Sequence, residues 1–166
     1  MKNSRISGAG RAPLPPTFLL PQASSLSVVV QIRETADIVR ARQSSRQVSS
    51  AYDASEAETT FITTIISELA RNILIHARKG EIQIDGSTED GHAGVRVTAR
   101  DKGPGIMDLR RALIGGYSTC GRMGIGLCGV QRMADEFDIE SSPGNGTAVT
   151  ARKWLNGVSH GVSMKS

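Results

Sequence analysis

A glycine-rich segment constrains the fold of this chain more than any other feature of its sequence. Residues 99–127 read ARDKGPGIMDLRRALIGGYSTCGRMGIGL and hold a large share of the chain's 18 glycines. A glycine that is fixed in a folded protein costs conformational entropy, so a dense group must serve backbone shapes or contacts that a side chain would block. The group follows Asp101, the last residue of an alternating segment. We therefore expect a loop whose backbone lies close to a bound molecule.

The chain has the size of one domain. Its 166 residues are enough for one compact core and too few for two. We expect a disordered tail at residues 1–25, which is rich in Gly, Ser and Pro, then a folded domain at 26–156 and a flexible C-terminal tail at 157–166. The Arg and Ser content of the first tail is faintly similar to a transit peptide, but prolines interrupt its apolar residues.

The distribution of charge argues against nucleic-acid binding. The net charge is +4, but the first 25 residues hold Lys2, Arg5 and Arg11 and no acid, whereas residues 26–155 hold 16 basic and 16 acidic residues. A nucleic-acid-binding domain concentrates Lys and Arg on one face or helix. We therefore expect no nucleic-acid partner.

Cysteine usage and hydropathy indicate a cytoplasmic protein. Cys120 and Cys128 are the only cysteines, and neither forms a CxxC pair or has a histidine at metal-ligand spacing. This usage fits a reducing compartment. No apolar run approaches the roughly 18 residues of a membrane span, so we expect no membrane partner.

Hydrophobic patterning predicts an α/β fold. It indicates a strand at residues 25–33, helices at 34–49 and about 55–78, a hairpin of strands 80–86 and 91–101 that turns around STED, a short helix at 124–135, and a closing hairpin that turns at 143–146. This order predicts a two-layer α/β sandwich with a mixed, largely antiparallel sheet.

The helix at about residues 55–78 carries a polar pair beside an apolar stripe. The stripe recurs every four residues, and we expect it to be buried throughout. It consists of Phe61, Ile65, Leu69 and Ile73. Glu68 and Asn72 lie one turn apart on a neighbouring face. A solvent-facing pair is the ordinary interpretation of that spacing, so the pair gains weight only from the other motifs.

Two glycine motifs together indicate a nucleotide. In DKGPG (101–105), a carboxylate at a strand end can accept a hydrogen bond from an exocyclic amine while the glycine backbone passes close to a planar ring. In GRMGIGL (121–127), glycines precede a helix, whose free N–H groups and dipole can hold phosphate oxygens. The chain has no GxxxxGK[ST] loop, and these glycines follow a hairpin rather than the first strand of a βαβ unit.

Four motifs, taken in order, resemble a known family. ExxxN on a helix, DxGxG after a strand, GxGL entering a helix and GT before the last strand resemble the Bergerat ATP-binding fold of the GHKL superfamily. The segments ISELARNILIHARKGEIQI, DKGPGI, GYSTCGRMGIGLCGVQRMADEFDIES and GNGTAVTARKW are most similar to anti-sigma-factor-type serine/threonine kinases, and among these to the RsbT-like switch kinases of bacterial stressosomes. The resemblance covers about residues 28–155 and implies ATP and Mg²⁺ as cofactors.

The resemblance implies a role for each matched residue. Glu68 corresponds to the base that orients or deprotonates the attacking hydroxyl, and Asn72 to the asparagine that binds Mg²⁺. Asp101 corresponds to the aspartate that contacts the adenine amine, with Gly103 and Gly105 leaving room for the ring.

The remaining matches surround the rest of the nucleotide. Gly124 and Gly126 correspond to the glycines that line the phosphates, Leu127 follows them in the GxGL motif, and Thr147 corresponds to the threonine behind the adenine pocket. Residues 115–123 correspond to a short ATP lid. An arginine like Arg122 suits the terminal phosphate in related anti-sigma kinases, but switch kinases do not all have it, so a solvated loop arginine is an equal alternative.

These matches predict a protein serine/threonine kinase of a partner-switching stress module. The substrate of the kinase would be a STAS-domain antagonist. Release from the phosphorylated antagonist would free the kinase to activate a PPM-type phosphatase or another output. The alternative is an anti-sigma factor that sequesters a sigma factor with bound ATP or ADP. Glu68 argues against a purely structural nucleotide but not against sequestration. The sequence leaves open whether the chain forms a homodimer.

Overall fold

The computed structural model describes residues 25–114 and 126–156. Most of the expected N-terminal tail, all of the expected C-terminal tail and the lid at 115–123 lie outside the described residues. Within the described part, no helix combines the length and the apolar character that crossing a membrane requires.

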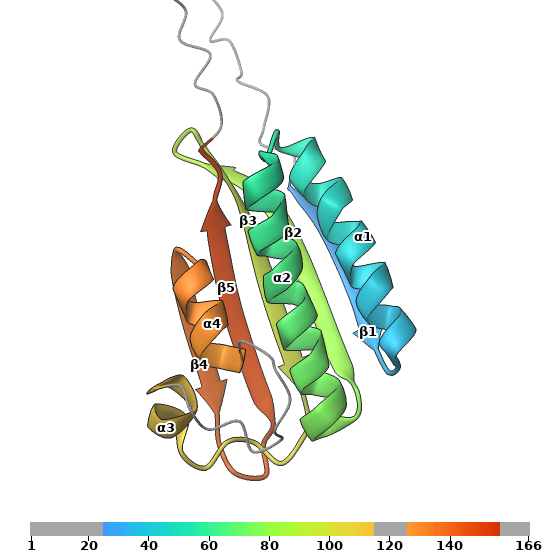
Figure 1. Ribbon diagram of the computed structural model, residues 1–166, viewed down its shortest axis with the longest axis vertical. Helices are drawn as coiled ribbons and strands as arrows, with labels where there is room; N and C mark the ends of the chain where they lie inside the picture. The colour runs from blue at the N-terminus through green and yellow to red at the C-terminus, as the bar shows by residue number, and fades with distance from the viewer. Residues whose placement is uncertain (1–24, 115–125, 157–166) are drawn as a thin grey trace, which may run out of the picture.

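The chain folds into one layer of helices over one antiparallel sheet (Figure 1). The elements, in order, are β1 (Leu26–Ile32), α1 (Thr35–Ala51), α2 (Glu56–Asn72), a π-helix (Ile73–Ala77), β2 (Gly80–Glu89), β3 (His92–Asp101), α3 (Leu109–Ile114), α4 (Gly126–Met133), β4 (Glu136–Ser141) and β5 (Thr147–Trp154). The strand order is β1-β2-β3-β5-β4. The two-layer α/β sandwich is confirmed, and each of its strand pairings is antiparallel.

Helix α2 forms the centre of the helical layer. It begins with a capping box, in which Ser55 and Glu58 bond each other's main-chain N–H groups. It packs against α1, α4 and the inner strands. Its apolar face closes the core against residues of β2, β3 and β5, such as Ile82, Val97 and Val149.

The expected stripe on α2 is correct at three positions and wrong at Phe61. Ile65, Leu69 and Ile73 are buried, but Phe61 is 43% exposed. A strict four-residue spacing advances about 40° around a helix at each step, so after a few such steps it leaves the buried face. The core follows a spacing of three and four residues instead and takes in Ile62 and Ile66.

The hairpin between β2 and β3 turns later than the sequence analysis predicts. The strands pair as far as Glu89 opposite His92, so most of STED lies within β2. The turn consists of Asp90 and Gly91, which both have left-handed backbone angles, with φ of 51° and 81°. An Asp-Gly pair is typical of a two-residue hairpin turn because both residues tolerate these angles.

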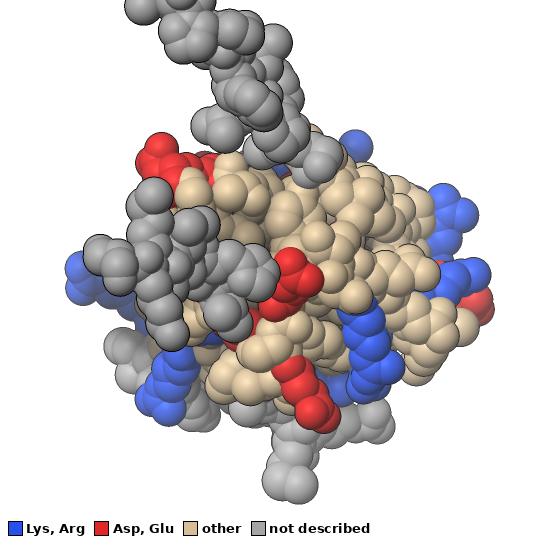
Figure 2. Space-filling view, turned by 90° about the horizontal axis from the view of Figure 1, so that it is seen from above, with Lys and Arg blue, Asp and Glu red and all other residues tan. Residues whose placement is uncertain are grey.

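Charged side chains of both signs surround the end of the molecule at which β1 begins and β5 ends. Seen from this end, Lys and Arg stand apart from one another and are interspersed with Asp and Glu (Figure 2). A continuous basic face is not visible among the described residues of this view. The picture agrees with the balanced charge of the folded segment.

Candidate functional site

Asp101 stands at the end of β3, opposite the first residue of β5. The ladder pairs it with Thr147, which brings two of the predicted nucleotide residues together. Its Oδ1 accepts a hydrogen bond of 2.8 Å from the N–H of Gly103. Within the described part of the chain, Oδ2 has no hydrogen-bond partner. The carboxylate is therefore oriented by its own loop and retains one oxygen that can accept from a ligand.

The glycines after Asp101 allow close contacts within the protein itself. Gly105 has a left-handed φ of 72°, and a Cβ on it would lie 2.1 Å from the carbonyl oxygen of Ser142. A Cβ on Gly103 would lie 2.7 Å from the Cβ of Ala77. The loop is thus pressed between the β4–β5 turn and the end of the π-helix. Room for an adenine ring beside these glycines stays a prediction.

Ser141 joins the two loops of the site, and the sequence analysis did not identify it. Its Oγ accepts the N–H of Ile106 at 2.9 Å and donates to the carbonyl oxygen of Gly146 at 2.9 Å. Thr147 Oγ1 lies 2.9 Å from the Oγ of Ser141. Because Ser141 has one hydroxyl proton, which goes to Gly146, Thr147 acts as the donor in this last contact. A serine before a Pro-Gly turn was the signal that could have revealed this role.

A second contact ties the β4–β5 turn to the DKGPG loop. The N–H of Gly144 donates to the carbonyl oxygen of Pro104 at 2.8 Å. A Cβ on Gly146, which has a φ of 80°, would lie 2.1 Å from the carbonyl oxygen of Asp101. The strand end that carries Asp101 is therefore held from both sides by glycine backbone.

Glu68 is a buried carboxylate on α2. It is 8% exposed, and its Oε1 forms an ion pair with Nη1 of Arg71, one turn further along the helix. The solvent-facing interpretation is therefore wrong for Glu68. The side chain of Arg71 is 45% exposed, so the ion pair extends from the interior of the protein to its surface.

Asn72 is the residue at which α2 ends and the chain continues as a π-helix. It is half-buried and is the last α-helical residue, because Ile73–Ala77 form a π-helix that ends at Arg78 with a left-handed φ of 66°. The sequence analysis expected one continuous helix to residue 78. Short π-helical turns occur often at functional sites. This one carries the chain from Asn72 to Ala77, which contacts Gly103 of the Asp101 loop.

Gly126 and Leu127 begin α4, which packs against α2. A Cβ on Gly126 would meet no described atom within 4 Å. Leu127 is half-buried and packs against the core. Arg122 and Gly124 lie outside the described residues.

The described groups suit a nucleotide better than an all-protein metal site. Asp101 offers an acceptor, and the start of α4 offers main-chain donors to an anion. Within residues 25–114 and 126–156, no group of three His, Cys, Asp or Glu side chains converges as metal ligands. A single amide oxygen such as that of Asn72 suits Mg²⁺, which keeps several waters and bridges substrate phosphates.

Comparison with known proteins places this chain in a family. Residues 33–153 match the family described as histidine kinase-like ATPase domain. The chain is 45% identical over 126 residues to the serine/threonine-protein kinase RsbT of Bacillus subtilis, covering 76% of this chain and 95% of that kinase. It is 34% identical over 111 residues to the anti-sigma F factor of the same species, covering 63% of this chain and 75% of that factor.

A solved structure agrees at the level of the fold. The crystal structure of the RsbU and RsbW domains of a Mycobacterium tuberculosis protein matches with a TM-score of 0.55 and 20% identity, over 87% of this chain and 34% of that one. The resemblance inferred from the motifs is thus confirmed. The chain belongs to the family of histidine kinase-like ATPase domains and, within it, to the ATP-dependent serine/threonine kinases of the RsbT type.

Proposed function

We propose that this kinase phosphorylates a serine or threonine of a small STAS-domain antagonist in a partner-switching stress module. Release from the phosphorylated antagonist then frees the kinase to activate a PPM-type phosphatase or another output. The 45% identity to RsbT over nearly the whole of that kinase supports the proposal. The observation that carries it is the buried carboxylate of Glu68, one turn before Asn72 on α2.

Glu68 acts as the general base. As the substrate hydroxyl oxygen bonds to the γ-phosphorus, the bond from that phosphorus to the leaving ADP oxygen breaks, and Glu68 accepts the hydroxyl proton. Burial limits the water around this carboxylate, and Arg71 holds it in one orientation. A site that only holds a nucleotide has no need of a base at this position.

Asp101 and the residues around it hold the nucleotide. The oxygen of Asp101 that Gly103 leaves unused accepts a hydrogen bond from the adenine amine, and Thr147 lies beside it across the ladder. The N-terminus of α4, with Gly126 and Leu127 as its first residues, offers main-chain donors to the phosphates.

Asn72 holds Mg²⁺ through its side-chain oxygen. The bound ion supplies positive charge that offsets the charge of the phosphates during transfer. The π-helix after Asn72 sets the position of this residue relative to the Asp101 loop through the contact of Ala77 with Gly103.

The direct test is phosphoryl transfer by the full chain. The protein is incubated with MgCl₂, γ-labelled ATP and the STAS-domain proteins encoded nearest to its gene, and the labelled residue is located by mass spectrometry. We expect label on a serine or threonine of one STAS protein, with none when Asn72→Ala replaces the wild type. Glu68→Gln should lower the transfer rate by about 100-fold or more while ATP affinity stays within about twofold.

Glu56→Gln provides the matched control, because Glu56 lies on the same helix but is exposed in its first turn. It should leave the transfer rate unchanged. Full transfer by the Glu68→Gln variant would remove the proposed base. Tight ATP binding with no label on any STAS protein would overturn the kinase substrate assignment.

Sequestration of a sigma factor is the second candidate, favoured by the 34% identity to an anti-sigma F factor. It predicts that the immobilised kinase retains a purified sigma factor in the presence of ADP or ATP. The partner-switching proposal predicts retention of a PPM-type phosphatase instead. The two pull-downs, run side by side, separate the candidates.

A further inference from the structure

Two lysines flank the end of the β2–β3 ladder that carries Asp101. The ladder ends with Gly80 opposite Asp101. Lys79 precedes Gly80 and Lys102 follows Asp101, so the two lysines lie on neighbouring segments just beyond this last pair, and both are exposed. Like charges on opposed positions of neighbouring strands are destabilising. The lysines therefore do not serve the stability of the hairpin.

Arg78 adds a third positive charge at this place. It is exposed and ends the π-helix with its left-handed φ of 66°. We call Arg78, Lys79 and Lys102 the basic corner. Among residues 25–114 and 126–156, none of the three forms an ion pair, whereas Arg100 pairs with Glu81 at 4.0 Å. The corner thus presents three positive charges that a ligand could neutralise.

Exposed apolar side chains lie in the same segments of the chain. Ile75, on the π-helix, is 45% exposed, and Met107, which follows the DKGPG loop, is 91% exposed. These segments lie at one end of the molecule, together with α3 and the β4–β5 turn (Figure 1). Methionine is enriched in protein interfaces, and charged groups around such contacts select a partner of opposite charge.

We propose that the basic corner binds an acidic segment of the kinase's protein substrate. This inference rests on the proposed function, since the substrate is the STAS-domain protein that receives the phosphoryl group. The corner lies directly beside Asp101, so a protein held there reaches the proposed nucleotide site from this side. Its positive charge attracts the acidic segment and speeds the encounter of the two proteins.

The nucleotide does not account for the three charges. In the proposed site Asp101 contacts adenine, which carries no negative charge, and the phosphates are assigned to the start of α4. A long polyanion such as nucleic acid also fits poorly, because the exposed carboxylates of Asp108 and Glu140 lie at the same end of the molecule. A protein that presents one local acidic cluster avoids these carboxylates.

Steady-state transfer to the STAS-domain protein that accepts the label tests the proposal. The corner variant, Lys79→Glu combined with Lys102→Glu, reverses two charges. It should raise the KM for the STAS-domain protein by at least about tenfold, while kcat and the KM for ATP change by less than about threefold. Raising NaCl from about 50 to about 300 mM should bring the KM values of wild type and variant closer together, because salt screens exposed charges.

The control variant combines Arg96→Glu with Arg132→Glu. It reverses two exposed cations on β3 and at the end of α4, outside the corner, and should keep the wild-type KM. ATP affinity, measured on each variant, shows whether it is folded. A wild-type KM in the corner variant, or an equal rise in both variants, would overturn the basic corner and leave the kinase assignment intact.

A binding measurement separates this inference from the proposed function. Fluorescence anisotropy of a labelled hexaglutamate peptide with the full chain, at about 50 mM NaCl, requires no phosphoryl transfer. The peptide should bind the wild type and the control variant, and should bind the corner variant at least about tenfold more weakly. Equal binding by all three proteins would overturn the basic corner, even if no STAS-domain protein accepts the label.

A DNA duplex of about 20 base pairs is the competing probe. If the duplex bound the wild type more tightly than the peptide and lost this binding in the corner variant, the corner would belong to a nucleic-acid site and the protein partner would be overturned. We expect weak binding of the duplex that is equal in the wild type and the control variant. Absence of transfer by the wild type, with peptide binding that depends on the corner, would overturn the proposed substrate alone.

Discussion

Asp101 and Glu58 are two carboxylates held by main-chain N–H groups at opposite ends of the molecule. They differ in how many of their oxygen atoms accept hydrogen bonds from the protein. Glu58 accepts from the N–H of Asn156 at 2.6 Å with one oxygen, and from both the N–H and Oγ of Ser55 at 2.7 Å with the other. Among the described residues, Asp101 accepts only from Gly103, with one oxygen. Both oxygens of Glu58 serve the fold, whereas the second oxygen of Asp101 has no partner in this part of the chain, as the proposed contact with a nucleotide requires.

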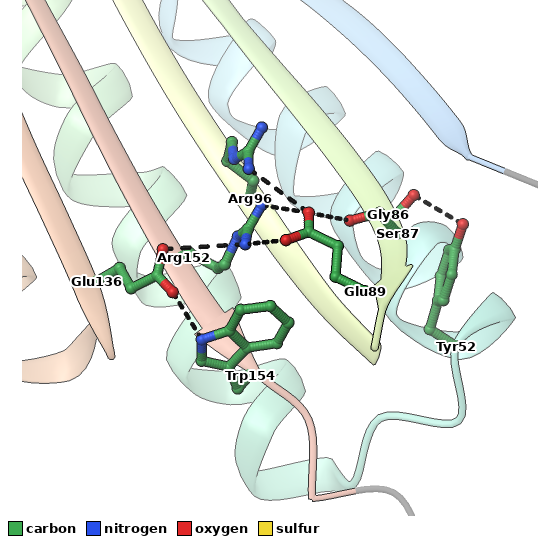
Figure 3. A network of polar contacts seen from close by, with 8 residues as sticks. All are labelled: Tyr52, Gly86, Ser87, Glu89, Arg96, Glu136, Arg152 and Trp154. Atoms are coloured by element: carbon green, nitrogen blue, oxygen red, sulfur yellow. Dashed lines mark hydrogen bonds and ion pairs between the residues drawn. The ribbon is translucent and has the colours of Figure 1, made fainter. Parts of the chain in front are cut away.

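The surroundings of the two carboxylates differ in the same way. At the end of the sheet where β5 finishes, side chains satisfy one another: Arg152 donates to both oxygens of Glu89 at 2.8 and 2.7 Å, and its guanidinium lies 4.6 Å from the centre of the Trp154 ring (Figure 3). The Trp154 Nε1–H donates to Glu136 at 2.9 Å. Around Asp101, glycine backbone makes the contacts. A nucleotide site, as proposed for the Asp101 end, must leave polar groups unsatisfied, and glycine allows this without loss of packing.

The largest effect should come from a methyl group placed at the Asp101 end. Gly146→Ala combines a left-handed φ of 80° with a Cβ 2.1 Å from the Asp101 carbonyl oxygen. Backbone strain and overpacking should together lower the free energy of unfolding by about 3 kcal/mol. Because the clash displaces the end of β3, ATP binding should be lost as well. Urea unfolding and calorimetric titration with ATP measure the two effects.

Gly144 offers a control in the same turn. It has nearly the same φ, 81°, but a Cβ there meets no atom of the described residues within 4 Å. Gly144→Ala should therefore cost only the strain of the left-handed conformation, about 1 kcal/mol, and should keep ATP binding. If the two variants lost equal amounts of unfolding free energy and ATP affinity, the close approach of Gly146 to Asp101 would have no importance.

Asp101→Asn tests the free oxygen directly. In an asparagine that keeps its oxygen on the N–H of Gly103, an NH₂ donor replaces Oδ2 and would face the adenine amine, which is itself a donor. ATP affinity should fall about 10- to 100-fold, with little change in the unfolding transition. Asp138→Asn, an exposed position on β4, is the control and should bind ATP as the wild type does. An unchanged affinity in Asp101→Asn would remove Asp101 from the nucleotide site.

Sequence patterns predicted the order of most elements because each of these has its own periodicity and its own turn residues. Asp101 could be proposed as a nucleotide contact from its position at a strand end before two glycines, whereas Thr147 was assigned to the same site only through the resemblance to a family. Their pairing across the ladder follows from the strand order. That order is not derivable from periodicity, and the sequence analysis did not predict it.

The errors occurred where contacts distant in sequence decide the structure. The exposure of Phe61 depends on which strands lie beneath α2, and its ring contacts the ammonium of Lys153 at 5.5 Å. The π-helix after Asn72 has no local sequence signal, since ILIHA is as compatible with an α-helix. Ser141 gains its role only when the DKGPG loop lies against the β4–β5 turn. Local propensity cannot report such contacts.

Arg152→Ala should weaken the opposite end of the sheet without affecting ATP binding. The Arg152 side chain is only 5% exposed, and its removal eliminates both the pair with Glu89 and the packing on Trp154. We expect the free energy of unfolding to fall by about 1–2 kcal/mol. Arg96, which lies 3.7 Å from Glu89 and is 43% exposed, provides a control whose replacement by alanine should cost less than about 0.5 kcal/mol. A loss of ATP affinity in Arg152→Ala would contradict the independence of the two ends.

The smallest effect should come from Glu58→Gln, and it should depend on pH. Burial raises the pKa of Glu58, but hydrogen bonds from the N–H of Asn156 and from Ser55, together with the nearby Lys153 ammonium, bring the pKa below its ordinary value of 4.5. A carboxylate whose pKa is lowered by folding contributes stability above its unfolded pKa and loses that contribution as pH falls through the folded value. At pH 7, Glu58→Gln should be less stable than the wild type by about 1 kcal/mol, and this difference should vanish as pH falls below about 4.5. Urea unfolding of both proteins between pH 7 and pH 3 measures it, with Glu56→Gln as the control for loss of one charge at this helix end. A difference that stays constant over this range would mean that Glu58 stabilises the fold by its shape rather than by its charge, and the contrast with Asp101 would then rest on packing alone.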